Sequence, residues 1–441
     1  MKNKLFYCIL IIVGLINVAK ADIFKADEFY LDNGLQVVVV ENHKAPLVKH
    51  MMWYKVGAVD EYRGKGGSAH LLEHLMFRGT HKISGNEFNR LMEQNGALSN
   101  AFTSYDVTVY HQFADISRLE LLMALEADRM HNLSFSPHDF EAEKNIVLQE
   151  RKQVVENNPA FNYNERLNLL FWGNSPYGQP ITGLPEEIEA LTYNDTMNFY
   201  HKYYAPNNAI LIISGDIDVE TAKQLAEKYY GKIAAKELKR AETPEIEDKF
   251  STTLQMSVAQ VTTPKIDIRY MLEPHKKLGD KIYDYMVLAE YLGGGSTSEL
   301  YKELVLNKHI AVTVYARYHF ASRTHSVFSI DLLGSQPFAQ DEVLQNIEQT
   351  LKEARHSLTN KRLTQLKRKM TADLIYMNDN PEDAADWIGY MLSSGFTLSD
   401  VLQYEKKIQA VKKSDVLKAF DELLSASKVI GILLPQQGEQ K

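Results

Sequence analysis

The chain has 441 residues, enough for two or three domains, and its 45% hydrophobic and 24% charged residues are typical of a globular protein. This balance excludes a disordered, collagenous or coiled-coil chain. The single cysteine, Cys8, excludes a disulfide framework, a thiolate zinc site and a cysteine nucleophile in the body of the protein. A net charge of −8 argues against nucleic acid as a partner.

The first 21 residues have the pattern of a secretory signal peptide. Two lysines precede an apolar run over residues 5–18, and Ala19 and Ala21 are the small residues of a cleavage site. The run is shorter than the roughly 20 apolar residues that span a membrane. We therefore expect a signal peptide over residues 1–21, an exported protein that is periplasmic or secreted, and no membrane span after cleavage. An uncleaved anchor is the alternative.

In the first half of the chain, stretches rich in valine, isoleucine and aromatic residues predict strands, and amphipathic stretches predict helices. Strands are expected at residues 35–41, 48–56, 107–113 and 209–214, and helices at 69–77, 118–130 and 137–157. Ser136, Pro137 and Asp139 form a capping sequence at the start of the last helix.

A charged stretch with few apolar residues, 232–249, is the expected linker. After it the order of elements repeats, with strands expected at 253–261, 266–272, 311–318, 327–333 and 428–434 and a helix at 281–292. We therefore predict two similar domains, over residues 22–231 and 250–441.

The most informative motif is His-x-x-Glu-His, formed by His70, Glu73 and His74. On a helix these three side chains share an arc of about 100°, with the histidines one turn apart. Two imidazoles so placed can bind one metal ion, and the glutamate beside it can take a proton from a water molecule. The alternative is a chance pair in a chain with 14 histidines.

A catalytic zinc site usually needs a third protein ligand, and a carboxylate from another element is expected because no third histidine follows closely. The helix at 137–157 offers Glu141, Glu143, Glu150 and Glu156. Glu143 and Glu150 are seven residues apart and share a face. We interpret Glu141 and Glu156 as solvated, and spacing alone leaves Glu143 and Glu150 both open as the ligand.

The segment over residues 67–80 resembles the signature of the inverted-zincin peptidases, the family of pitrilysin, insulin-degrading enzyme and mitochondrial processing peptidase. Segments 56–61, 100–108, 146–151 and 293–304 are also similar to that family. The resemblance implies a Zn²⁺ cofactor, with Glu150 as third ligand beside His70 and His74. It also implies that Glu143 orients a ligand histidine.

With the element order, the resemblance implies an α+β fold of two similar α/β sandwich domains, each a mostly antiparallel sheet packed against helices. It implies a zinc-dependent endopeptidase in which Glu73 is the general base. The substrate, a peptide or an unfolded protein, would add a strand to an edge strand of the sheet. Asn100 and Ala101 are the expected backbone contacts.

The second domain is expected to be catalytically silent, because its helix at 281–292 has no histidine. It would form the far wall of a substrate chamber. A two-domain chain resembles one half of such a chamber, so we expect a homodimer or a heterodimer with a related chain. One alternative is a non-catalytic partner subunit or scaffold. Another is an iron-dependent lyase, which would need a cysteine that the chain lacks after residue 8.

Overall fold

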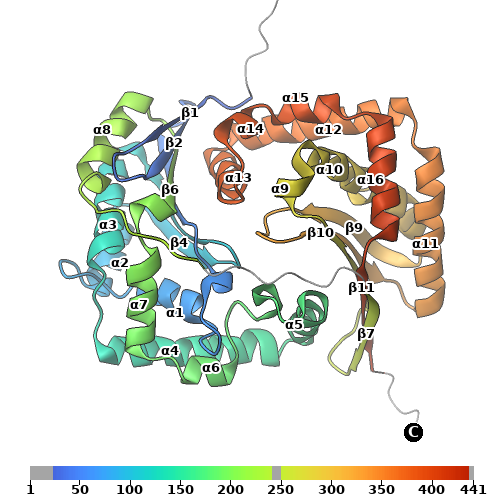
Figure 1. Cartoon of the computed structure of the whole chain (residues 1–441), viewed down its shortest axis with the longest axis horizontal. Coiled ribbons are helices and arrows are strands. Elements are labelled where there is room, and N and C mark those ends of the chain that lie inside the picture. Colours follow the sequence, from blue (N-terminus) through green and yellow to red (C-terminus); the bar gives the residue numbers. More distant parts are fainter. Residues whose placement is uncertain (1–22, 241–249, 437–441) are drawn as a thin grey trace, which may run out of the picture.

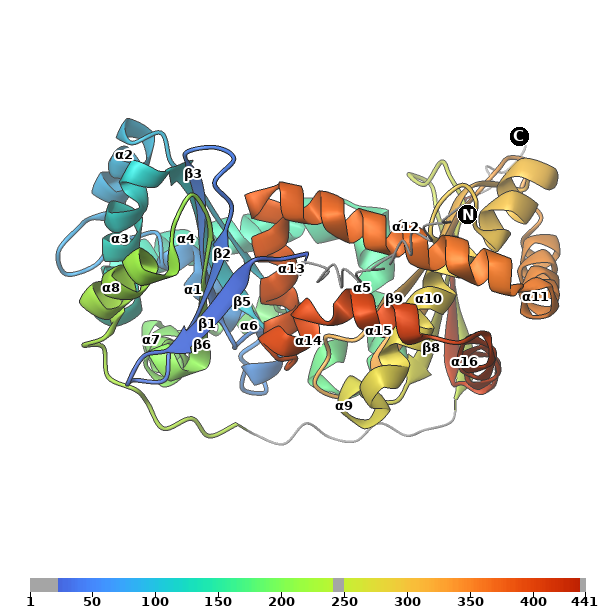
Figure 2. The same cartoon turned by 90° about the horizontal axis from the view of Figure 1, so that it is seen from above.

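The computed structural model describes residues 23–240 and 250–436 (Figure 1). The predicted signal peptide lies outside the described residues, as do residues 241–249 of the predicted linker and residues 437–441. The described chain forms two halves that lie side by side, each a sheet with helices packed on it (Figures 1 and 2). No helix within the two described ranges is both long and apolar enough to cross a membrane.

The first half contains a six-stranded sheet in the order β1-β2-β6-β3-β5-β4, in which β2 and β6 are the parallel pair. Its strands are β1 (Ala26–Tyr30), β2 (Gln36–Glu41), β3 (Leu47–Tyr54), β4 (Leu98–Thr103), β5 (Thr108–Asp115) and β6 (Ala209–Gly215). The apolar strand β6 is buried along its whole length, as a central strand covered on both faces must be. Strand β4 forms one edge of the sheet.

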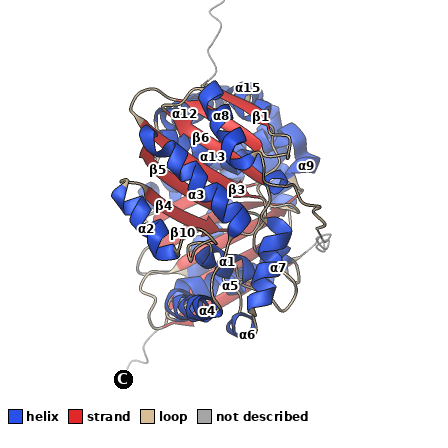
Figure 3. Ribbon diagram, turned by 90° about the vertical axis from the view of Figure 1, so that its left-hand side faces the viewer, coloured by secondary structure: helices blue, strands red, loops and turns tan. Residues whose placement is uncertain are grey.

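One face of this sheet shares a core with α1, α3, α4, α7 and α8 (Figure 3). The helices of the first half are α1 (Ser68–Leu75), α2 (Gly85–Gln94), α3 (Leu119–Asn132), α4 (Pro137–Arg151), α5 (Pro159–Trp172), α6 (Pro185–Glu189), α7 (Tyr193–Tyr203) and α8 (Val219–Tyr230). The helix expected at 137–157 is α-helical to Arg151 and continues as a π-helical turn over Lys152–Glu156.

The second half contains a five-stranded sheet in the order β7-β11-β8-β10-β9, with β7 and β11 parallel. Its strands are β7 (Ser251–Val258), β8 (Lys265–Leu272), β9 (Ala311–His319), β10 (Ser326–Gly334) and β11 (Lys428–Pro435). Its helices are α9 (His275–Leu278), α10 (Ile282–Gly293), α11 (Gln340–Ser357), α12 (Asn360–Asp379), α13 (Pro381–Ser393), α14 (Leu398–Leu402), α15 (Tyr404–Ala410) and α16 (Lys413–Ser425).

Apart from the additional edge strand β1, the two sheets have the same topology. Strands β7 to β11 repeat β2 to β6 both along the chain and across the sheet, and α10 follows β8 as α1 follows β3. The predicted fold class, two similar halves with mostly antiparallel sheets packed against helices, is therefore confirmed. The exact domain boundaries stay a prediction.

One helix of each half packs on the sheet of the other half. Helix α13 packs on β3 and β6, and Gly389 approaches Trp53 so closely that a Cβ atom would lie 2.1 Å from the indole ring. Helix α5 packs on β11, where a Cβ atom on Gly431 would lie 2.1 Å from the Tyr163 hydroxyl. These reciprocal contacts, visible in Figure 1, join the halves through their cores.

Candidate metal centre and active site

Helix α1 begins at a position that only glycine fills without strain. Gly67 has φ +85°, and a Cβ atom there would lie 2.6 Å from the carbonyl oxygen of Thr182. The carboxylate of Glu61 accepts hydrogen bonds from the amides of Gly67 and Ala69, at 3.0 and 2.8 Å, and so caps the helix. The helix is anchored by apolar side chains that are fully buried, Leu71, Leu72 and Leu75.

Helix α4 crosses α1 and brings the two candidate carboxylates to it. Ser136 and Asp139 form the predicted capping box at its start. At its other end Arg151 binds both carboxylate oxygens of Glu165 at 3.0 Å, which fixes the turn that carries Glu150.

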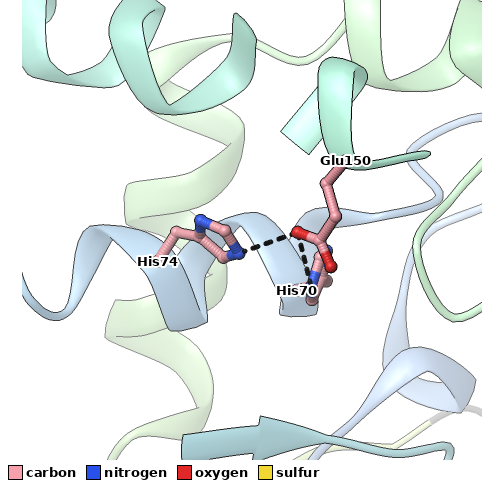
Figure 4. A group of neighbouring side chains, drawn as sticks. All are labelled: His70, His74 and Glu150. Atoms are coloured by element: carbon pink, nitrogen blue, oxygen red, sulfur yellow. Dashed lines mark ion pairs between the residues drawn. The ribbon is translucent and has the colours of Figure 1, made fainter. Parts of the chain in front are cut away.

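The side chains of His70, His74 and Glu150 converge (Figure 4). One ligand atom from each lies within 4.8 Å of the other two. The Oε2 atom of Glu150 is 3.9 Å from Nε2 of His70 and 3.4 Å from Nε2 of His74. Within residues 23–240 and 250–436, no other group of three histidine, cysteine or acidic side chains has this arrangement.

The protonation states suit metal binding. Burial, reinforced by the nearby His74, lowers the pKa of His70 to about 4, so its ring is neutral at pH 7 and offers a lone pair. The neighbouring His74 and His70 lower the pKa of Glu150, which keeps this carboxylate ionised. Two imidazole nitrogens and one carboxylate oxygen are a donor set that zinc takes, so the residues fit the ion that the sequence predicts.

The two glutamates that spacing left open have different positions. Glu150 faces the Nε2 atoms, whereas Glu143, only 3% exposed, lies 3.0 Å from Nδ1 of His74. The other oxygen of Glu143 pairs with Arg78. A carboxylate on Nδ1 holds the proton there and leaves the Nε2 lone pair of His74 free for a metal.

Glu73 lies on the same helix face and is held by a residue that the sequence did not single out. The Thr103 hydroxyl donates to Oε2 of Glu73 at 2.6 Å. Burial raises the pKa of Glu73. Thr103 is two positions after Ala101 on β4, so the two side chains share a face of the strand. That register is the signal that could have identified it.

Asn100 and Ala101 lie on β4, which pairs with β5 and forms the free edge of the sheet beside the site. Asn100 is exposed, and its Oδ1 accepts the amide hydrogen of Ala101 at 2.9 Å. The structure thus places both residues at an edge that can accept another strand.

A recess of about 310 Å³ opens beside Glu73 and His74. Its remaining walls are polar and aromatic, formed among others by Phe77, Arg78, Asn86 and Asn89.

Comparison with known proteins identifies the family. A model of the insulinase family, peptidase family M16, matches residues 36–183, and a model of the peptidase M16 inactive domain matches residues 190–370. The zinc protease PqqE of Helicobacter pylori is 27% identical over 433 residues, which are 97% of this chain and 96% of that protein. A probable mitochondrial-processing peptidase subunit beta of Schizosaccharomyces pombe is 31% identical over 209 residues, 47% of this chain and 45% of that one.

Solved structures agree on the fold. A protease from Helicobacter pylori superposes with a TM-score of 0.83 at 25% identity, covering 93% of this chain and 100% of that one. The first half of the periplasmic protease PqqL of Escherichia coli gives a TM-score of 0.79 at 18% identity, covering 93% and 92%. Matching family models in both halves and this two-domain architecture lead to one assignment: the chain is a short, two-domain member of peptidase family M16, the insulinase family.

Proposed function

We propose that this protein is a zinc-dependent endopeptidase that cleaves peptides or unfolded protein segments. The observation that carries the proposal is the convergence of His70, His74 and Glu150 beside a buried Glu73. The relatives named zinc proteases support the choice of metal.

In this proposal His70, His74 and Glu150 hold the ion. A zinc ion there would lower the pKa of a water molecule toward ~7 and polarise the scissile carbonyl group. Glu73 takes the proton from the water and passes it to the leaving amine. Thr103 fixes the orientation of the Glu73 carboxylate through its hydrogen bond.

The substrate binds as an additional strand on β4, with backbone contacts at Asn100 and Ala101. The free edge of β4 next to the site supports this geometry. The recess beside Glu73 and His74 receives one substrate side chain.

We further propose that the protein is exported and works as a dimer, of two copies or with a related chain. The signal-like residues 1–21 and the likeness to a periplasmic protease support export. This chain covers 47% of the structure of the periplasmic protease PqqL, and in our proposal a second chain supplies the other half of the chamber. Light scattering of the purified protein tests this, because a stable and fully active monomer would contradict it.

The decisive experiment measures bound metal and peptide cleavage in wild type, Glu73→Gln, Glu150→Gln and a control, Glu141→Gln. Glu141 lies on the same helix as Glu150, but its side chain is 59% exposed and pairs with Lys144. We expect Glu73→Gln to keep zinc and lose about 10²–10⁴-fold in rate, as the loss of a general base does. Glu150→Gln should lose zinc, and Glu141→Gln should match wild type.

Equal activity of Glu73→Gln and wild type, or no zinc in either, would overturn the proposal. A zinc-loaded wild type that cleaves no peptide would favour the alternative of a non-catalytic partner subunit.

A further inference from the structure

A second pocket, outside the metal site, lies between the two halves, and we call it the interhalf pocket. Its volume is about 300 Å³. Helix α9, on the side of the second half that faces the first (Figure 1), supplies His275 and Lys276. The other charged residues in its walls are Lys55 and Asp106 of the first half, Arg240 of the segment that follows α8, and Arg323 of the second half. A molecule bound here would contact both halves.

The carboxylates at the interhalf pocket already form ion pairs with arginine side chains. Arg323 donates to both carboxylate oxygens of Asp60, each at 2.8 Å, and its Nε lies 3.0 Å from Asp106. Arg240 lies 4.0 Å from Asp60 and donates to the carbonyl oxygen of Lys55. The two acids therefore face two arginines, and they leave the two lysines uncompensated.

Lys55 and Lys276 have no ion-pair partner within the described part of the chain. Burial and the charge of Arg240 lower the pKa of Lys55, and burial and the charge of Arg323 lower the pKa of Arg240. The cations of the pocket thus oppose one another, and a bound anion would relieve that repulsion.

His275 forms part of the pocket wall. It is only 6% exposed and stacks on Phe396, with ring centroids 5.2 Å apart. Burial and the charge of Lys276 lower the pKa of the His275 ring, and nearby backbone groups of Phe320, Ser394 and Ser322 partly offset this. The buried His275 ring thus helps to hold one wall of the pocket in place.

We propose that the interhalf pocket binds a multivalent oxyanion, of phosphate or polycarboxylate chemistry, which bridges the two halves. Lys55 of the first half and Lys276 of the second half neutralise it. The pocket volume suits an anion of the size of diphosphate or citrate. The proposal concerns binding and stability, and it does not depend on peptidase activity.

Isothermal titration and thermal unfolding of the full chain, at constant ionic strength in chloride, test the proposal with diphosphate and with citrate as separate probes. The variants are Lys55→Met and Lys276→Met. The control is Lys277→Met, because this neighbouring lysine is 71% exposed and pairs with Glu273. Lys276 is itself exposed, so its variant should fold.

We expect one equivalent of diphosphate or citrate to bind wild type and Lys277→Met alike, and to bind the other two variants at least about tenfold more weakly. Binding of diphosphate alone would assign phosphate chemistry, and binding of citrate alone would assign polycarboxylate chemistry.

Addition of the anion should reverse the order of the unfolding temperatures of wild type and the two lysine variants. Without anion, Lys55→Met and Lys276→Met should match or exceed wild type, because each removes an uncompensated charge. With anion, wild type should become the more stable. No binding at millimolar concentration, unchanged affinity in Lys276→Met, or the absence of this reversal would overturn the proposal.

Discussion

Glu126 and Arg129 form a buried ion pair on α3, and the loss of this pair gives a sharp prediction. The two residues are 1% and 2% exposed, one turn apart on α3. The Tyr54 hydroxyl also donates to Glu126, at 3.3 Å. The guanidinium lies 4.7–5.0 Å from the ring centroids of three aromatic residues, Phe77, Phe88 and Tyr110.

The substitution Glu126→Gln keeps the shape of the side chain and leaves Arg129 without a counter-charge. Breaking one partner of a buried pair costs about 3–5 kcal/mol. The three rings retain a cation–π attraction of roughly 0.5–2 kcal/mol with the guanidinium, and the amide oxygen can still accept one hydrogen bond. We therefore expect the free energy of unfolding to fall by about 2–4 kcal/mol.

Urea denaturation followed by circular dichroism measures this change. The matched control is Glu87→Gln, because Glu87 and Arg90 form a pair with the same spacing on α2 whose side chains are 40% and 52% exposed. That variant should unfold at the wild-type urea concentration, since exposed pairs are screened by water. If the two substitutions shift the midpoint equally, burial is not what gives the Glu126 pair its importance.

Three further outcomes are expected. Thr103→Val should lower kcat/KM about 10–100-fold through loss of the hydrogen bond to Glu73, with zinc content unchanged and most activity restored in Thr103→Ser; an unchanged rate would contradict this. Burial and the charge of Asp415 raise the pKa of Asp284 to about 6. The ionised carboxylate therefore destabilises the fold above that pH, and Asp284→Asn should raise the urea midpoint at pH 7.5 by an amount that shrinks toward pH 4; a constant difference would refute the assignment. A chelator should lower the unfolding temperature of wild type but leave that of Glu150→Gln unchanged, and equal shifts would argue against metal binding at Glu150.

Most of the central strands and helix α1 could be predicted from local sequence patterns. The valine run of β2 and the apolar run of β6 mark strands buried on both faces, and the His-x-x-Glu-His spacing marks one face of α1. The edge strands β1 and β4 were harder to predict from the sequence. β1 has mostly exposed or half-exposed side chains, and β4 exposes Leu98 and Phe102, so neither has an apolar face that predicts burial.

Contacts between distant segments could not be read from the sequence. The spacing of Glu143 and Glu150 placed both on one helix face, but only the crossing of α1 and α4 separates their positions around His74. The hydrogen bond from Thr103 to Glu73 depends likewise on where β4 meets α1. Helical periodicity predicts that α5 and α13 have apolar faces, and it does not say which sheet those faces cover.

Because α5 packs on the sheet of the second half and α13 on that of the first, the structure indicates what would happen if the chain were nicked between residues 240 and 250. Each fragment would keep a helix seated in the core of the other, with Gly389 against Trp53 and Gly431 against Tyr163. The fragments should therefore remain one particle after the peptide bond is cut, and neither should fold well when expressed alone. For the same reason we expect the two halves to move together as one body.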